Sequence, residues 1–63
     1  MQKGKVKFFN NSRGFGFIVP QSGEKEIFVH VSGLIDEISE NDDVVFDTVQ
    51  ESKGISAVKV QKA

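Results

Sequence analysis

Two phenylalanines separated by a single glycine constrain this chain most. Residues 13–18 read Arg-Gly-Phe-Gly-Phe-Ile. In an extended strand successive side chains point to opposite faces, so Phe15 and Phe17 share one face while Gly16 and Ile18 share the other. Two residues of strand span about 6.6 Å, which suits two consecutive unstacked bases. The pattern is typical of a platform on which single-stranded bases stack, with Arg13 just upstream for a phosphate.

The size and composition predict one small domain. The chain has 63 residues and no cysteine, so it has neither a disulfide nor a thiolate metal site. No apolar run approaches the roughly 20 residues of a membrane span, and the first residues do not resemble a signal peptide. We therefore expect a soluble, unprocessed, cytoplasmic protein.

Charge is divided unevenly along the chain. The net charge is −1, which by itself argues against a nucleic-acid partner. Residues 1–31, however, carry a surplus of three positive charges, whereas residues 32–63 have a balance of −4. Five of the six phenylalanines lie in the basic half. A local basic and aromatic face can bind a polyanion even on a slightly acidic protein, and its binding should be sensitive to salt.

Short alternating segments separated by turn residues predict an all-β fold. Clusters of Asn, Ser and Gly, and the single proline, Pro20, mark the ends of the segments. The architecture expected is a five-stranded antiparallel barrel, which removes open sheet edges. The predicted strands are 3–10, 15–19, 26–31, 44–50 and 55–61.

The first predicted strand contains an ambiguity at Phe8-Phe9. Lys5 and Lys7 flank Val6, so the lysines should point outward and Val6 inward. Strict alternation would then bury Phe8 along with Val6. A β-bulge here would instead place Phe8 beside Lys7 on the outer face, and periodicity alone does not decide between the two.

The second and third predicted strands should be antiparallel neighbours, because a short connection joins them. Their outward side chains would then form one patch, with Lys5 and Lys7 beside it. In the third strand Ile27, Val29 and Val31 are expected to point inward. The outward residues of the patch are Phe15, Phe17, Phe28 and His30.

Residues 32–43 are too many for a tight hairpin. Leu34, Ile35 and Ile38 stand among acidic residues, and we expect these aliphatics to form a short helical turn that plugs one end of the barrel. Val6 and Phe46 are predicted core residues, and Phe9 a partly buried one. The acidic residues of 36–43 are expected to form a solvated surface.

The pattern contains no catalytic or cofactor site. His30 is the only histidine and has no cysteine, second histidine or Ser-His-Asp arrangement to work with, so we expect it to stack or donate a hydrogen bond. The glycines at 14 and 16 lack the third glycine and the helix of a dinucleotide-binding loop. We predict no enzyme activity, no metal and no cofactor.

Three segments resemble the cold-shock domain family, above all its single-domain bacterial members. They are G-K-V-K-F-F-N (4–10), R-G-F-G-F-I (13–18) and I-F-V-H-V-S-G (27–33), in the family's order and spacing over nearly the whole chain. The resemblance implies an oligonucleotide-binding-fold (OB-fold) barrel that binds single-stranded RNA and DNA with little sequence preference and acts as an RNA chaperone affecting transcription or translation. It also implies that Phe8 is the exposed ring of its pair. The contacts that the resemblance implies are Lys7, Phe8, Arg13, Phe15, Phe17, Phe28 and His30. To these we add two further expected phosphate contacts, Lys5 and Lys53.

The chain departs from the family's pattern in four places. Phe8 stands where Trp is usual, and Val31 where a base-stacking Phe is usual. The 34–43 loop is shorter and lacks its aromatic residue, and Ile55 replaces the proline of a basic-Gly-Pro turn that begins here with Lys53. Because each stacked base contributes about 1–3 kcal/mol, we expect weaker binding or a shorter site than in a typical member.

An alternative from another class is a small barrel that binds a protein through the same aromatic patch, because exposed apolar patches also mark protein partners. A weak dependence of binding on salt would favour it. We expect a monomer and leave a dimer open.

Overall fold

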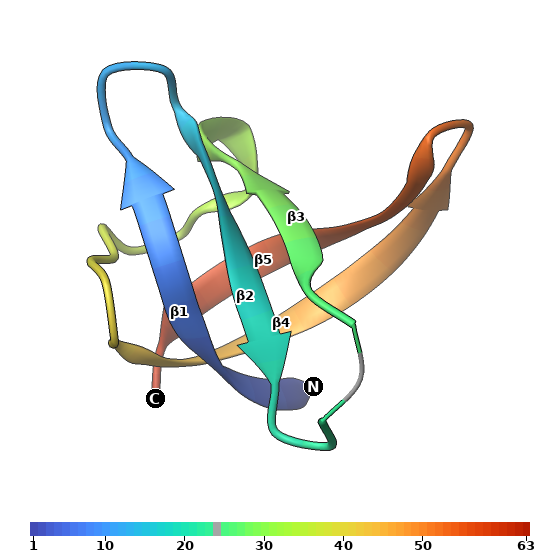
Figure 1. Ribbon diagram of the computed structural model, residues 1–63, viewed down its shortest axis with the longest axis horizontal. Helices are drawn as coiled ribbons and strands as arrows, with labels where there is room; N and C mark the ends of the chain where they lie inside the picture. The colour runs from blue at the N-terminus through green and yellow to red at the C-terminus, as the bar shows by residue number, and fades with distance from the viewer. Residues whose placement is uncertain (24) are drawn as a thin grey trace.

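The computed structural model describes residues 1–23 and 25–63. It has five strands and one short 3₁₀ helix that surround a single core (Figure 1). The elements are β1 (Gln2–Asn10), β2 (Phe15–Pro20), β3 (Ile27–His30), η1 (Val31–Gly33), β4 (Asp43–Glu51) and β5 (Gly54–Lys62). All five predicted strands are confirmed, with ends that differ by no more than one residue.

The strands close into a barrel in the order β1-β2-β3-β5-β4. Four of the pairings are antiparallel, as predicted. The seam between β3 and β5 is parallel and brief, pairing Phe28 with Ser56 and Val29 with Ala57. The predicted all-β OB-fold barrel is therefore confirmed, with one parallel seam that local periodicity could not reveal.

Inward-pointing side chains of the strands fill the barrel. Val6 and Phe46 are fully buried, as predicted, and Phe9 is half-buried against them. Removal of such side chains from water is the main favourable term in folding. The buried core consists of Val6, Ile18, Val29, Ile38, Val44, Phe46, Ala57 and Val60.

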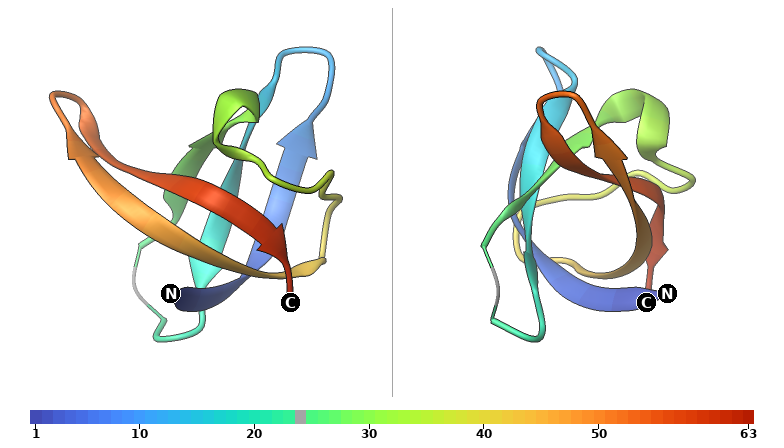
Figure 2. Two further views of the ribbon diagram at one scale, coloured as in Figure 1. Left: turned by 180° about the vertical axis from the view of Figure 1, so that it is seen from behind. Right: turned by 90° about the vertical axis from the view of Figure 1, so that its right-hand side faces the viewer.

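The ends of β4 and β5 that the β4–β5 turn joins extend beyond the barrel as a two-stranded arm (Figures 1 and 2). β1 pairs with β4 only as far as Phe46, and β3 reaches β5 only at Ser56 and Ala57. Residues 47–51 therefore pair with β5 alone. The register between β4 and β5 shifts at Lys59, whose φ of +53° is unusual for a residue with a side chain.

The third strand ends one residue earlier than predicted. Val31 belongs to η1 and is 51% exposed, so the expectation that it points inward is wrong. The chain turns here into η1, where the Leu34 N–H donates to the Val31 carbonyl at 3.2 Å and the His30 ring caps the helix by accepting from the Ser32 N–H. These interactions outweigh the strand preference of a β-branched residue.

The predicted helical turn of aliphatic residues does not form. The 3₁₀ helix precedes them, and the chain then runs extended beside β5, where the Ile35 N–H donates to the Val60 carbonyl at 2.7 Å. Ile38 is buried and Leu34 packs against the core, so two of the three aliphatics do help fill the barrel. Ile35 is 60% exposed and does not.

Candidate nucleic-acid interface

The pairing of β2 with β3 builds the centre of the site. Phe15 lies opposite His30 and Phe17 opposite Phe28, in antiparallel register. Since Gly16, Ile18 and Val29 occupy the alternate positions and are buried, these four side chains all point outward. The predicted adjacency of the two strands, on which the patch depends, is confirmed.

A β-bulge adds Phe8 to this group. Val6 lies opposite Ile18, but Phe8 lies opposite Phe17, so two residues of β1 are accommodated against one of β2. The extra residue reverses the alternation, and Phe8 is 37% exposed although Val6 is fully buried. The bulged alternative, with Phe8 on the outer face, is the correct one.

The four rings pack against one another in a closed cycle. Phe8 lies 6.4 Å from Phe15 and 5.6 Å from Phe17, between ring centroids. Phe28 completes the cycle, nearly parallel to Phe15 at 6.0 Å and edge-on to Phe17 at 5.9 Å. Such pairs hold rings in place, so the surface is largely organised before a ligand arrives. We call Phe8, Phe15, Phe17, Phe28 and His30 the aromatic face.

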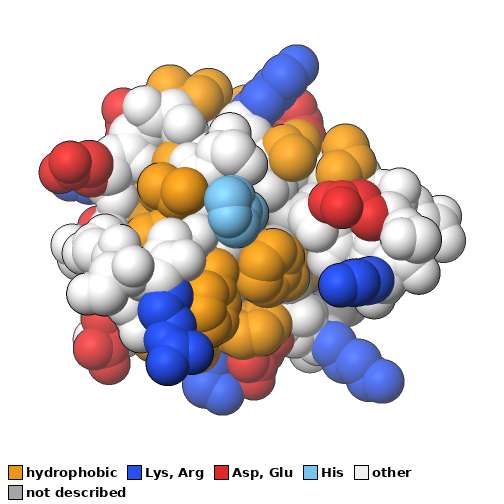
Figure 3. Space-filling view, turned by 90° about the horizontal axis from the view of Figure 1, so that it is seen from above, with side chains coloured by type: hydrophobic (Ala, Val, Ile, Leu, Met, Phe, Trp, Pro, Cys, Tyr) orange, Lys and Arg blue, Asp and Glu red, His pale blue; other side chains and the backbone are white. Residues whose placement is uncertain are grey.

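The aromatic face is open to solvent on its outer side. Phe8 and Phe28 are more than one-third exposed, whereas Phe15 and Phe17 are half-buried because their neighbours cover their flanks. In the space-filling view hydrophobic side chains gather beside the histidine, and Lys and Arg side chains lie around them (Figure 3). An exposed aromatic surface with basic side chains around it suits bases with attached phosphates.

Ser32 fixes the orientation of the His30 ring. The Ser32 backbone N–H donates to Nδ1 at 3.2 Å, and the Ser32 Oγ lies 2.9 Å from the same atom. A backbone N–H can only donate, so Nδ1 carries a lone pair and the proton of the neutral ring is on Nε2. The Nε2–H is therefore available to donate to a ligand. The sequence signal for this contact is the serine two residues after the histidine.

Two of the predicted phosphate-binding lysines are held by carboxylates. The Lys7 ammonium donates to Glu26 at 2.7 Å, and Lys5 lies 3.7 Å from Asp43. All four side chains are at least 41% exposed, so these ion pairs are weak enough for a phosphate to displace. Sequence analysis missed both acidic partners, because they come from distant segments.

The other two predicted cations differ in position. Arg13 lies in the turn between β1 and β2, where the Asn10 side chain accepts from its backbone N–H at 3.1 Å, and its side chain makes no ion pair with the described residues. Lys53 is exposed in the turn at the tip of the β4–β5 arm. Arg13 thus directly precedes the aromatic face, whereas Lys53 lies on a separate element.

No group of three or more His, Cys, Asp or Glu residues in the described part of the chain could hold a metal ion. Nor does any helix in residues 1–23 and 25–63 have the length and apolar character to cross a membrane.

Comparison with known proteins gives a consistent result. A family model described as the 'Cold-shock' DNA-binding domain matches residues 2–63. The chain is 44% identical over 62 residues to the cold shock-like protein CspE of Escherichia coli K12, covering 92% of this chain and 90% of that one. It is 41% identical over 66 residues to the major cold shock protein of Micrococcus luteus, covering 98% of each.

A solved structure confirms the fold. The "drosophila Unr CSD456" structure superposes with a TM-score of 0.82 over 98% of this chain and 26% of that one, at 23% identity. The family model covers nearly every residue, and the cold-shock relatives exceed 40% identity over almost their whole length. This chain therefore belongs to the cold-shock DNA-binding domain family.

Proposed function

We propose that this protein binds single-stranded RNA and DNA with little sequence preference through the aromatic face, and acts as an RNA chaperone that affects transcription or translation. The observation that carries this is the closed cycle of four outward phenylalanine rings with His30 beside it. Every base has a π-face, so stacking on these rings tolerates any sequence.

The geometry favours single strands over duplexes. Rings exposed on the outside of a sheet can stack only with unpaired bases, because the bases of a duplex are already stacked on each other. Arg13 and Lys7 would bind the phosphates nearest the rings, and Lys5 and Lys53 those farther away. The binding is proposed as non-catalytic and needs no cofactor.

RNA chaperoning would follow from this binding by mass action. A protein that binds only the open form of an RNA hairpin shifts the equilibrium toward that form. We propose that a monomer does this in the cytoplasm, where transcripts are found. Low sequence preference suits such a role, since many different hairpins must be opened.

The direct test is a titration with a pyrimidine-rich single strand. The chain has no Trp or Tyr, so a Phe8→Trp background restores the residue usual in the family and supplies a fluorescent probe. In that background Phe15→Ala and Phe17→Ala should each weaken binding about tenfold. Val49→Ala, which truncates an exposed apolar residue on the arm, is the control and should bind like the parent. If both phenylalanine variants also bind like the parent, the aromatic face is not the binding site.

Salt dependence separates this function from a protein partner. Each phosphate neutralised on a single strand should contribute about −0.7 to the slope of log affinity against log salt. A slope near zero, or no binding to the single strand at all, would favour a protein ligand for the aromatic face.

A further inference from the structure

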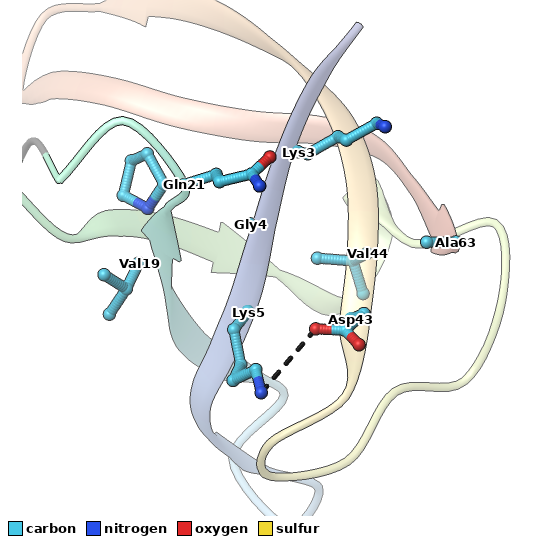
Figure 4. A pocket seen from close by; sticks show the side chains of 9 residues that line it. Lys3, Gly4, Lys5, Val19, Gln21, Asp43, Val44 and Ala63 are labelled. Carbon is cyan, nitrogen blue, oxygen red and sulfur yellow. Dashed lines mark ion pairs between the residues drawn. The ribbon is translucent and has the colours of Figure 1, made fainter.

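A second surface groove lies on the outside of β1, beyond the aromatic face (Figure 4). It has a volume of about 530 Å³ and lies between the end of β2 and the start of β4. Its exposed apolar part comes from Val19, which is 37% exposed, while Pro20 lines the groove but is buried. Lys3 and Lys5 rise from β1 to flank it, and Asp43 faces Lys5.

The register makes this groove a continuation of the aromatic face. Along β2 the outward residues are Phe15, Phe17 and then Val19, at steps of about 6.6 Å. Across on β1, Phe8 lies opposite Phe17 and Lys5 opposite Val19. A single-stranded nucleic acid that stacks on the rings and continues along β2 toward Pro20 would therefore reach Val19 one two-residue step beyond Phe17.

The ion pair of Lys7 with Glu26 lies between the two surfaces. Val6 and Ile27 both pair with Ile18, so the neighbouring Lys7 and Glu26 meet across the outside of β2 near that residue. A phosphate passing this point could replace Glu26 as the partner of Lys7. The ion pair is exposed, so the exchange costs little.

The chemistry of the groove suits another nucleotide. Val19 offers an exposed apolar surface for a sugar or base, whereas Pro20 beside it is buried. Among the lining side chains, the ammonium groups of Lys3 and Lys5 outnumber the single carboxylate of Asp43. A net positive groove that adjoins a polyanion site raises the local concentration of phosphate. An acidic partner is therefore favoured over a neutral one.

We propose that a single strand bound to the aromatic face continues over Val19 into this groove, where Lys3 and Lys5 hold its next phosphates. The inference rests on the proposed function and extends the site beyond the rings. It assigns Lys5 to this extension, and it adds Lys3 and Val19, which sequence analysis did not select.

The test compares oligothymidylates of about four and about eight nucleotides, both within the range of site sizes of OB-folds. Lys3→Gln/Val19→Ser should weaken binding of the longer strand about threefold at low salt and make its slope of log affinity against log salt shallower by about 0.7. Binding of the shorter strand should stay unchanged. The matched control is Lys59→Gln/Val49→Ser, which makes the same two changes in a separate groove lined by Met1, Asp47 and Val58. The control should leave the binding of both lengths unchanged.

Amide chemical shifts provide a second readout that needs no variant. The longer strand should move the signals of Lys3, Lys5, Val19 and Gln21, and the shorter strand should not. Unchanged affinity of the Lys3→Gln/Val19→Ser variant for the longer strand, or equal shifts with both lengths, would overturn the extension. Binding of the shorter strand to the Phe15→Ala variant tests the aromatic face alone. Failure of the proposed function can therefore be distinguished from failure of the extension into the groove.

Discussion

A Cβ atom on Gly16 would lie 2.3 Å from the carbonyl oxygen of Phe8 and 2.8 Å from the Cα of Phe9. The glycine between the two rings of β2 therefore does more than leave space on the surface. It lets the bulged segment of β1 approach β2 closely enough for Phe8 to join the aromatic face. We predict that Gly16→Ala destabilises the fold by about 3 kcal/mol, since backbone atoms cannot move aside as a side chain can.

Gly23→Ala is the control for this prediction. Gly23 has a φ of +83° and nothing within 4 Å of its would-be Cβ, so its substitution measures only backbone strain, about 1 kcal/mol. Urea unfolding followed by circular dichroism gives both values. Equal destabilisation by the two substitutions would contradict the close approach at Gly16.

Lys59 offers a stabilising substitution. Its φ of +53° lies in the left-handed region, which disfavours residues with a Cβ, and its side chain is exposed at the bulge of β5. Lys59→Gly should raise the free energy of unfolding by about 0.5–1 kcal/mol. Lys59→Ala removes the same charge but keeps the Cβ, so thermal and urea unfolding should give this variant a free energy of unfolding close to that of the parent. A Lys59→Gly variant no more stable than Lys59→Ala would rule out strain at this position.

Glu26 should weaken nucleic-acid binding, because its carboxylate forms an ion pair with the Lys7 ammonium, at 2.7 Å between Oε2 and Nζ. Glu26→Gln frees Lys7 for a phosphate, and we expect affinity for a single strand to rise about twofold, in line with an exposed ion pair. Calorimetric titration at two salt concentrations should also show a steeper salt dependence.

Glu40→Gln is the matched control for Glu26. Glu40 is exposed in the turn before β4 and makes no ion pair with the described residues, so its neutralisation alters only the net charge. If Glu40→Gln strengthens binding as much as Glu26→Gln does, the effect is a general one of charge and not a release of Lys7.

Val31→Phe should strengthen binding. Val31 is 51% exposed, so a larger side chain at this position has open solvent to occupy. This position resembles that of a stacking residue in the family, and a restored ring should increase affinity about fivefold, the low end of one stacked base. Val49→Phe adds the same ring on the arm and should leave affinity unchanged. A fluorescence titration in the Phe8→Trp background compares the two, and no gain for Val31→Phe would show that this position receives no base.

Local periodicity was sufficient to predict most of the fold and half of the site. Side chains in a strand alternate with a period of two, so Phe15 and Phe17 had to share a face opposite Ile18 whatever the rest of the chain did. The same rule identified Phe28 and His30, and the short connection between the strands identified them as neighbours of the first pair.

Tertiary structure decided what depends on contacts between distant segments. The choice between Phe8 and Phe9 rests on a bulge that exists only in the register of β1 against β2. Val31 is exposed because η1, capped by the His30 ring, ends β3, while the Val31 N–H stays bonded to the Gly14 carbonyl of the β1–β2 turn. The carboxylates that hold Lys5 and Lys7 come from residues far along the chain. The sequence by itself thus determined which side chains alternate on each strand, and only the closed barrel determined which of them meet, because register and ion pairing are set between strands and not within them.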